Sequence, residues 1–379
     1  MNKKEIILFG AGKIAEKFIY QYFDEVNIRC LWDNHKTGEL LGYQIVKPWY
    51  EKNHFIVVTS SSYLEIRGQL ISMGYCEFHD FIPAQIFKKK VAVAYGNCHI
   101  NAIKLYLECH KEFSSEYGFY PFPMIYTLKD INMEYEKILN NCDLFFHQSV
   151  RKDNVYGEGY SSERMLQHIK GSCEVISIPN LYGLPKYLFP QLEVHPRWQQ
   201  GSFCPFFIDK NIVAWLRDRT GIETIKKYVL DGGVYSKDEI IAMWEEFKLK
   251  IYKREQEWDI KISDYIFNHY KKERIFSDIN HISSRTAREI ALRVLKYMGF
   301  KKEIFLELPM MDDMESIIYK DVREALGLEF EDCIIRRYSF GSISLNSYEM
   351  NIEEYLDQLC QFTRFCIKKE KEKYFKGRV

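Results

Sequence analysis

Short runs of apolar residues, each followed by glycine or polar residues and then by a helical pattern, recur along the first half of the chain. These runs occupy residues 5–9, 27–32, 54–58, 91–95, 142–148 and 173–178. Short apolar runs between turn signals are typical of buried strands, and their alternation with helical patterns predicts parallel sheets. Residues 211–273 have mostly helical patterns. The expected fold class is therefore α/β with a largely helical C-terminal part.

The first 88 residues predict a half-Rossmann unit. The GAGKIA turn at residues 10–15 stands between strand 5–9 and a helix that ends near Phe23, which is the context of the dinucleotide fingerprint G-x-G-x-x-A. A helix over 63–73 and a short strand over 76–78 are expected to complete the unit. About 85 residues suffice for one mononucleotide-binding half but not for two, which argues against an NAD dehydrogenase.

Gly10, Gly12, Lys13 and Asp33 are the candidate nucleotide-binding residues of this unit. The glycines allow a tight turn, the helix N-terminus can hold a phosphate, and Asp33 can accept hydrogen bonds from a ribose. The alternative is that the glycines only make a compact turn and that nothing binds there.

This N-terminal stretch resembles the small Rossmann-like domain that precedes many sugar-modifying enzymes, such as sugar-nucleotide N-acetyltransferases. The matching segments are FGAGKIAEKF at 9–18, WDN at 32–34, GYQIVKPW at 42–49 and IVVTSSSYLEI at 56–66. The resemblance implies a nucleotide or sugar nucleotide as the ligand of a domain at residues 1–88.

A second strand–turn–helix carries the most informative site. The lysines at 88–90 indicate a solvated linker, after which strand 91–95 opens a second domain, 91–379, and runs into Gly96-Asn97-Cys98-His99 and an amphipathic helix. A cysteine at the start of a helix lies where the helix dipole favours an anion, so the pKa of the Cys98 thiol should fall. Cys98 is thus a candidate nucleophile, with nearby backbone N–H groups and Asn97 as oxyanion donors. The alternative is a buried cysteine in a tight turn.

Polar residues follow two further strands of the same expected sheet. Gln148, Arg151 and Lys152 come after strand 142–148, and Asn180 comes after strand 173–178. Because the carboxyl ends of parallel strands form the ligand crevice, these side chains are expected beside Cys98. A long loop over 189–209, which contains Arg197, is expected to cover the cleft. Ordinary loop capping is the alternative for these residues.

A D-x-x-H motif precedes a helix expected from about Arg285 to Met298. His281 in this position can serve as a general base, and Asp278 or a backbone carbonyl can hold its tautomer. The alternatives are a capping or core histidine, with Ser284 as the helix cap. The pattern also predicts a helix near 310–314 and a C-terminal helix over 353–375.

Composition excludes several classes of protein. The 53 Lys and Arg balance the 53 Asp and Glu, which argues against nucleic-acid binding through a bulk basic field. The sequence contains neither a membrane-spanning apolar run nor a signal-peptide core, so a cytoplasmic protein is expected. The ten cysteines form no C-x-x-C pair, which argues against a zinc ribbon or a thioredoxin motif. Cys98 and Cys109 lie about 16 Å apart along one helix, too far for one metal ion, and no metal is expected.

From Val91 to about Met298 the chain resembles the WcbI-type capsule polysaccharide biosynthesis family. The matching segments are GNCH at 96–99, DLFFHQSVR at 143–151, IPNLYG at 178–183 and FSDINHIS at 276–283. The resemblance implies coenzyme A binding and acetyl transfer to a capsular sugar. The first and last segments also resemble SGNH hydrolases with Cys98 in place of serine, which implies an SGNH-like α/β domain.

The preferred hypothesis is a transferase that moves an acetyl group from acetyl-CoA to a sugar hydroxyl in surface polysaccharide synthesis. Either Cys98 carries the acetyl group and His281, oriented by Asp278, deprotonates the sugar, or His281 acts alone as base. The expected oxyanion and substrate-binding residues are Gly96, Asn97, His99, Gln148, Asn180 and Asn280. The candidates for the CoA phosphates are Arg151, Lys152 and Arg197.

Two alternatives belong to other functional classes: an SGNH-like esterase or deacetylase that uses water as acceptor, and a non-catalytic sugar-nucleotide-binding protein. The expected partner is a carbohydrate acceptor and not a nucleic acid. A second copy of the chain or other polysaccharide-synthesis enzymes are further possible partners.

Overall fold

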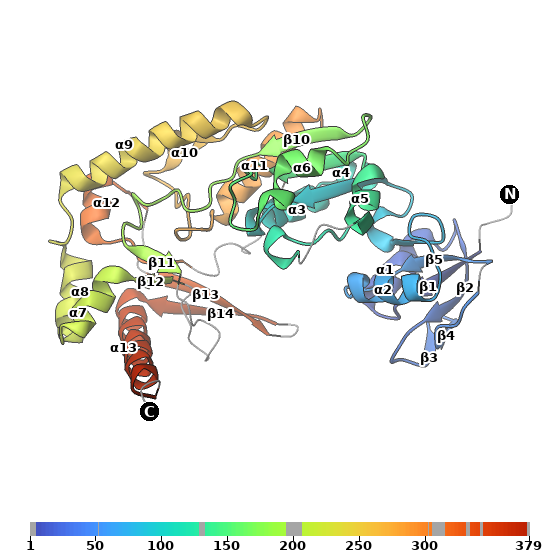
Figure 1. Cartoon of the computed structure of the whole chain (residues 1–379), viewed down its shortest axis with the longest axis horizontal. Coiled ribbons are helices and arrows are strands. Elements are labelled where there is room, and N and C mark those ends of the chain that lie inside the picture. The colour runs from blue at the N-terminus through green and yellow to red at the C-terminus, as the bar shows by residue number, and fades with distance from the viewer. Residues whose placement is uncertain are drawn as a thin grey trace. The chain divides into compact units, whose positions relative to one another are not determined.

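The computed structural model describes residues 5–51, 53–128, 133–194, 207–301, 303–304, 315–330, 334–341 and 344–376. The chain forms two compact units (Figure 1). The first unit comprises residues 1–97 and 110–176, and the second comprises residues 98–109 and 177–379. The expected boundary between residues 88 and 91 stays a prediction.

A six-stranded sheet forms the N-terminal part of the first unit. Its strands are β1 (Glu5–Phe9), β2 (Asn27–Trp32), β3 (Gly38–Leu40), β4 (Tyr43–Val46), β5 (Phe55–Val58) and β6 (Phe81–Pro83). They lie in the order β3-β4-β2-β1-β5-β6, and every pairing except β3 with β4 is parallel. Ile6, Ile7 and Leu8 in β1 have no exposed surface, because a central parallel strand is covered on both faces.

Helices α1 (Lys13–Tyr22) and α2 (Tyr63–Ser72) connect these strands as the apolar pattern predicted. The buried side chains of α1 include Ala15, Phe18 and Ile19, which pack against β1 and β2 in one apolar cluster. The half-Rossmann element order is therefore present, with a β3–β4 hairpin that the sequence analysis did not predict.

The predicted short strand over 76–78 is wrong. Residues 76–80 form a turn in which the Asp80 carboxylate accepts the backbone N–H of Cys76 at 2.7 Å, and Phe78 has a positive φ of 63°. The edge strand is β6. Lys88 and Lys89 lie in a short turn before β7, which begins at Lys90, and the interpretation of 88–90 as a linker stays a prediction.

A four-stranded sheet completes the first unit. Its strands are β7 (Lys90–Tyr95), β8 (Tyr117–Phe119), β9 (Leu144–Gln148) and β10 (Glu174–Ile178), in the order β10-β9-β7-β8. β7 pairs in parallel with both β8 and β9. The short helices α4 (Lys111–Glu116), α5 (Met133–Asn140) and α6 (Ser162–Leu166) lie between these strands.

One apolar core spans both sheets of the first unit. Phe9 and Val58 of the first sheet and Val93 and Phe145 of the second belong to the same buried cluster. A buried polar network adds to it: Arg67 Nε donates to Glu77 Oε2 at 2.7 Å, and the Tyr120 hydroxyl donates to Glu77 Oε1 at 2.6 Å. Because Arg67 lies on α2 and Tyr120 follows β8, Glu77 connects the two sheets.

We expect Glu77→Gln to lower the free energy of unfolding by about 3 kcal/mol, because it removes the carboxylate that pairs with the buried Arg67 charge. Urea unfolding measures the difference. Glu65→Gln on the exposed side of α2 is the matched control and should change stability by less than about 0.5 kcal/mol. Equal effects of the two substitutions would contradict a buried ion pair between the sheets.

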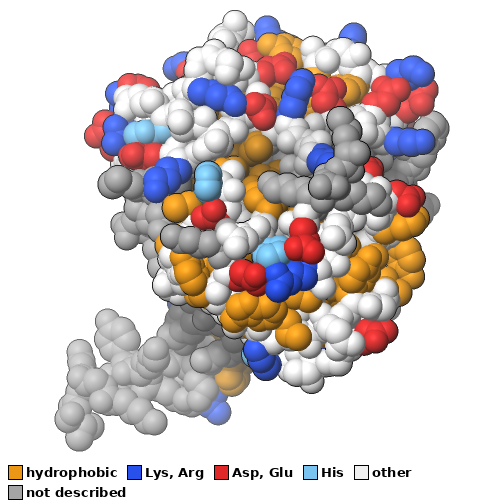
Figure 2. Space-filling model, turned by 90° about the vertical axis from the view of Figure 1, so that its right-hand side faces the viewer, with side chains coloured by type: hydrophobic (Ala, Val, Ile, Leu, Met, Phe, Trp, Pro, Cys, Tyr) orange, Lys and Arg blue, Asp and Glu red, His pale blue; other side chains and the backbone are white. Residues whose placement is uncertain are grey.

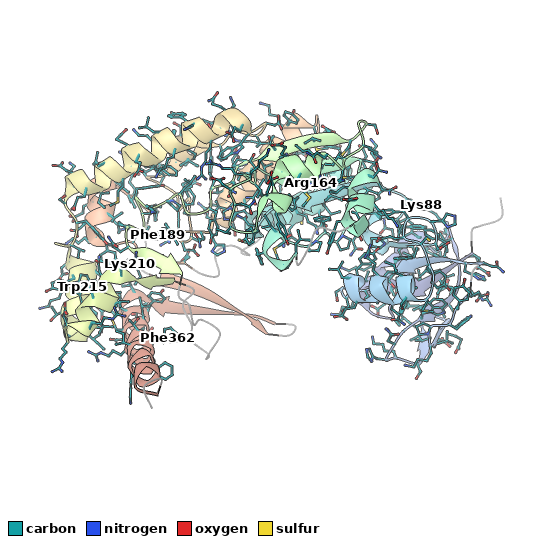
Figure 3. The ribbon with its side chains drawn as sticks, viewed as in Figure 1. Lys88, Arg164, Phe189, Lys210, Trp215 and Phe362 are labelled. Atoms are coloured by element: carbon teal, nitrogen blue, oxygen red, sulfur yellow. The ribbon has the colours of Figure 1, made fainter. Side chains whose placement is uncertain are left out.

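The second unit is mostly helical, as predicted. Its helices are α3 (Cys98–Cys109), α7 (Lys210–Arg217), α8 (Ile222–Asp231), α9 (Lys237–Arg254), α10 (Ser263–His269), α11 (Ser284–Tyr297), α12 (Lys320–Leu326) and α13 (Ile352–Lys376). A capping box formed by Ser236 and Glu239 opens α9. α13 packs against α7, and Trp215 on α7 and Phe362 on α13 are labelled in Figure 3.

Two antiparallel strand pairs in this unit were not predicted. β11 (Leu192–Val194) pairs with β12 (Phe207–Asp209), so the stretch predicted as a loop over 189–209 contains two strands. β13 (Ile334–Gly341) pairs with β14 (Ser344–Asn351). The helix expected near 310–314 lies outside the described residues. The cap of α11 is Ser283 and not Ser284, because the Ser283 hydroxyl accepts the N–H of Thr286.

Figure 2 shows acidic and basic side chains interspersed on the face it presents, in keeping with the balanced charge of the chain. No helix in the described part of the chain combines the length and the apolar character needed to cross a membrane.

Candidate functional site

Cys98 is the first residue of α3, directly after the turn that follows β7. The apolar face of α3, including Ile100, Ile103 and Leu107, is buried, and α3 packs against α11 in the second unit. The Cys98 side chain itself is partly exposed. A sulfur in this position is held rigidly and is accessible to a ligand.

The Asp278 carboxylate organises the loop that precedes α11. Its Oδ1 accepts the backbone N–H groups of Asn280 at 2.7 Å and of His281 at 2.8 Å. Its Oδ2 lies 2.7 Å from His281 Nδ1, and the carboxylate is fully buried. Asp278 therefore fixes both the backbone and the ring of His281. The His281 ring also forms a hydrogen bond with Cys98. Because Nδ1–H is donated to Asp278, Nε2 is the ring nitrogen that remains for Cys98.

The charge state of His281 follows from these contacts. Burial alone would lower the pKa of His281, but hydrogen bonds and negative charge from Asp278 and Cys98 raise this pKa to about 10. The ring is therefore protonated at neutral pH.

Hydrogen bonds to backbone carbonyls hold the rest of the loop in place. Ser277 N–H donates to the His281 carbonyl at 3.0 Å, and Ser283 N–H donates to the Ile275 carbonyl at 2.9 Å. Arg274 donates to the carbonyls of Ser277 and Ser316 at 3.2 and 3.1 Å. Arg274 and Ser316 were not predicted as part of the site, because they are 42 residues apart in the chain and share no local motif.

His99 connects α3 to this loop. Its buried ring makes a hydrogen bond through Nε2 with the Asn280 carbonyl. Burial, and then the charge of His281, lower the pKa of His99 to about 3, although the bond to Asn280 opposes the change. A neutral ring donates through Nε2–H, so His99 supports the Asn280 backbone, and its predicted role in substrate binding stays a prediction.

We expect His99→Gln to keep the reactivity of Cys98 and His99→Leu to lower it about tenfold, because leucine leaves the buried Asn280 carbonyl without a donor. Glutamine matches the reach of His Nε2 with a neutral N–H donor. The measurement is the rate at which iodoacetamide alkylates Cys98 at pH 7, followed by mass spectrometry of the Cys98 peptide. Equal rates for the two variants would show that the bond does not position the site.

The turn before Cys98 is built by Gly96, Asn97 and Gln148 in the first unit. The buried Gln148 Oε1 accepts the Asn97 N–H at 2.8 Å. A Cβ at position 96 would collide with this same Gln148 oxygen, so a larger residue there would displace the Gln148 amide from its bond with Asn97. Gln148 and the Asn97 backbone thus support the turn, and the roles of these three residues in substrate binding stay predictions.

Two of the three residues predicted for the CoA phosphates lie within the described part of the chain. Arg151 and Lys152 lie in the first unit, mostly exposed, and pair with Asp153 at 3.2 Å and Glu163 at 2.9 Å. Arg197 lies outside the described residues. In the second unit, the Asn180 side chain accepts the N–H of Tyr182 at 3.3 Å, which is the capping role considered as an alternative.

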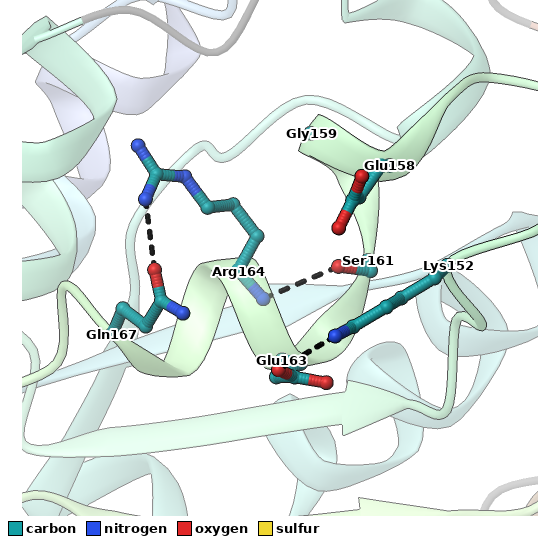
Figure 4. A pocket seen from close by; sticks show the side chains of 7 residues that line it. All are labelled: Lys152, Glu158, Gly159, Ser161, Glu163, Arg164 and Gln167. Atoms are coloured by element: carbon teal, nitrogen blue, oxygen red, sulfur yellow. Dashed lines mark hydrogen bonds and ion pairs between the residues drawn. The ribbon is translucent and has the colours of Figure 1, made fainter.

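Lys152 also lines an open pocket of about 390 Å³. Figure 4 shows its lining: Lys152, Glu158, Gly159, Ser161, Glu163, Arg164 and Gln167. Two acidic and two basic side chains face this space, so its charges balance. A site for a phosphate normally has an excess of donors and positive charge, and this pocket does not favour one.

The Asp33 carboxylate accepts hydrogen bonds at the glycine turn that precedes α1. Asp33 Oδ2 accepts the Ala11 N–H at 2.9 Å, and Asp33 Oδ1 accepts the N–H groups of His35 and Lys36 at 2.8 Å. Burial raises the pKa of Asp33, but these N–H groups lower it further than burial raises it. The Asp33 carboxylate therefore already accepts backbone N–H groups that a bound phosphate would need. Nucleotide binding by Gly10, Gly12, Lys13 and Asp33 stays a prediction.

Together these features define a mixed α/β protein with two parallel-rich sheets, a helical C-terminal part and a cysteine, histidine and aspartate joined by hydrogen bonds. Within the described residues, no group of three or more His, Cys, Asp or Glu could hold a metal ion. The chain belongs to the WcbI family of polysaccharide biosynthesis enzymes: the family model matches residues 91–303, more than half of the chain. The resemblance found in the sequence is therefore confirmed.

A solved structure supports the same fold. It is described as WcbI, a novel polysaccharide biosynthesis enzyme, in the native form without a disulfide bond between CoA and one of its cysteines. The two chains are 16% identical, with a TM-score of 0.55, over 73% of this chain and 90% of that one. Identity this low supports the fold alone. No curated protein matches the chain.

Proposed function

We propose that this chain transfers an acyl group from acyl-CoA to a sugar hydroxyl in the synthesis of a polysaccharide. The single observation that carries the proposal is the Cys98–His281–Asp278 arrangement. Membership of the family supports a carbohydrate acceptor, and the CoA named with the similar solved structure supports a thioester donor. The first and last motifs support an SGNH-like arrangement with Cys98 in place of serine.

In the first half of the reaction, the Cys98 thiolate attacks the acyl carbon of the thioester. His281 donates its Nε2 proton to the leaving sulfur, so CoA leaves as a thiol and the acyl group is bonded to Cys98. Asp278 keeps Nδ1–H in place and stabilises the imidazolium before the proton is transferred.

In the second half, the neutral His281 Nε2 takes the proton from the sugar hydroxyl. The sugar oxygen attacks the acyl carbon on Cys98, the carbon–sulfur bond breaks, and the thiolate and imidazolium return. The backbone N–H groups at the start of α3 and the Asn97 side chain are our candidates for stabilising the oxyanion.

The raised pKa of His281, about 10, favours this covalent route over the direct one. In the direct route His281 must be neutral when donor and sugar are both bound. A ring protonated at neutral pH cannot accept the sugar's proton, whereas it is already prepared to protonate the leaving sulfur.

Acylation of Cys98 tests the proposal. The full chain is incubated with acetyl-CoA, quenched in acid, and its Cys98 peptide is examined for an acetyl group by mass spectrometry. We expect acetylation of Cys98 in the native chain and none in Cys98→Ala, while Cys76→Ala, which removes an exposed cysteine of the first unit, stays acetylated at Cys98.

Thermal unfolding with CoA, UDP-sugars and NAD as parallel ligands is the companion measurement. CoA at 100 times its dissociation constant should add about 2.7 kcal/mol to the free energy of unfolding. A shift with UDP-sugar alone would favour the sugar-nucleotide-binding alternative. Turnover of a simple ester without CoA would favour the hydrolase.

A further inference from the structure

Two cysteines of the first unit lie side by side at the start of neighbouring strands. Cys142 precedes β9 and Cys173 precedes β10, and these strands are neighbours in the sheet. The Glu174 N–H donates to the Asp143 carbonyl at 2.9 Å, which joins the two segments directly beside the cysteines. The two thiols form a hydrogen bond with each other.

The spacing of neighbouring strands in a sheet lies within the range that disulfides join. Neighbouring strands lie about 4.8 Å apart, and disulfides join Cα atoms about 4.4–6.8 Å apart. Cys142 is buried and Cys173 is partly exposed, and both are free thiols. A reagent from solvent therefore reaches Cys173 first, and Cys142 is next to it.

The surroundings of Cys173 stabilise its thiolate. The hydrogen bond from Cys142 lowers the pKa of Cys173 against the effect of burial, and the Phe145 N–H and the Lys170 charge lower it further. Burial raises the pKa of Cys142. Cys173 is thus the cysteine of the pair whose thiolate is favoured, whereas the Cys142 thiol also donates to the Leu144 carbonyl at 2.9 Å.

We propose that Cys142 and Cys173 form a thiol-modification site that reacts with low-molecular-weight disulfides, such as glutathione disulfide, to give an internal disulfide. The site lies outside the Cys98 triad and is independent of the proposed acyl transfer.

The reaction balances in two exchange steps. The Cys173 thiolate attacks one sulfur of glutathione disulfide, the S–S bond breaks, and one glutathione thiolate leaves and takes up the Cys142 proton. The Cys142 sulfur then attacks the Cys173 sulfur, and the second glutathione leaves as a thiolate that is protonated by water. The protein loses two electrons and two hydrogens, and glutathione disulfide is reduced to two thiols.

The full chain, folded, is incubated at a series of ratios of reduced to oxidised glutathione. It is then quenched in acid, alkylated with N-ethylmaleimide in denaturant, digested and examined by mass spectrometry. We expect the peptides of Cys142 and Cys173 to be joined, with a loss of two hydrogens and of both alkylation sites, and to be released by reduced glutathione. The exposed Cys76 and Cys109 are internal controls that gain only single glutathione adducts.

Two variants test the order of attack. Cys142→Ser should leave Cys173 with a stable glutathione adduct, and Cys173→Ser should leave Cys142 fully alkylatable. The proposal is overturned if both cysteines of the native chain are still alkylated at the most oxidising ratio, or if Cys142 is oxidised without Cys173. The joined peptide should also form in Cys98→Ala, so a failure here is distinct from a failure of the acyltransferase proposal.

Discussion

Replacing Cys98 with alanine is expected to lower the rate of acyl transfer from acetyl-CoA by about 10⁶-fold, as removal of a nucleophile does in other triads. The residual rate would come from substrate binding and from any oxyanion donors that remain. The reason lies in the order of events: without the sulfur no acyl group bonds to the chain, and a protonated His281 is unable to activate the sugar hydroxyl directly.

The measurement is release of CoA thiol in the presence of acceptor sugar, at saturating acetyl-CoA. Cys109→Ala is the matched control, because Cys109 is an exposed cysteine at the other end of α3. We expect its rate to stay within about twofold of the native chain, since surface substitutions change stability by less than about 0.5 kcal/mol. If Cys98→Ala turned over normally, His281 would have to act by itself, and the direct route would replace the covalent one.

Asp278→Asn is expected to have the second largest effect, a loss of about 10³-fold or more in the same reaction. The amide keeps the size of the side chain but removes its charge, and its NH₂ group cannot accept the N–H of His281. The ring would lose its fixed tautomer, and the pKa of His281 would fall towards the ordinary value for histidine.

The pH dependence of stability gives a second readout of this substitution. The groups facing His281 are Asp278, Cys98 and His99. Because the pKa of His281 is raised to about 10 in the folded chain, its contribution to stability is complete below the unfolded pKa of about 6.5. That contribution is lost as pH rises through 10.

We therefore expect the unfolding midpoint of the native chain to fall between about pH 6.5 and 10, and Asp278→Asn to remove most of this slope. Asp264→Asn is the control, because the exposed Asp264 pairs with Arg293 at 2.5 Å and its carboxylate is ionised throughout this range. Equal slopes in native and Asp278→Asn chains would mean that Asp278 does not hold the charge of His281.

Local patterns predicted most strands and helices because the burial of a central parallel strand is visible in its own residues. Strand β1 is the clearest example: its apolar run needs no knowledge of its neighbours. The patterns failed where pairing depends on another segment. The β3–β4 hairpin has few buried residues, so no apolar run marks it. The edge strand β6 begins after the predicted position, because the turn held by Asp80 precedes it.

The candidate site divides in the same way. Cys98 at a helix start and the D-x-x-H motif are local signals, and each was visible alone. Their partnership was not, because 183 residues separate Cys98 from His281 and only the packing of α3 against α11 brings them together. Gln148 and Asp33 show the opposite case, since each looked like a ligand-binding residue and each has its acceptors engaged by backbone N–H groups.

The sequence by itself determined the fold class, the family and the chemical types available at the site. The tertiary structure decided which of those groups meet and in which charge state, because burial and contacts between distant segments set a histidine's pKa. His99 and His281 demonstrate this: two imidazoles in the same site have pKa values shifted in opposite directions, one lowered by burial and the other raised by Asp278 and Cys98 against the effect of burial.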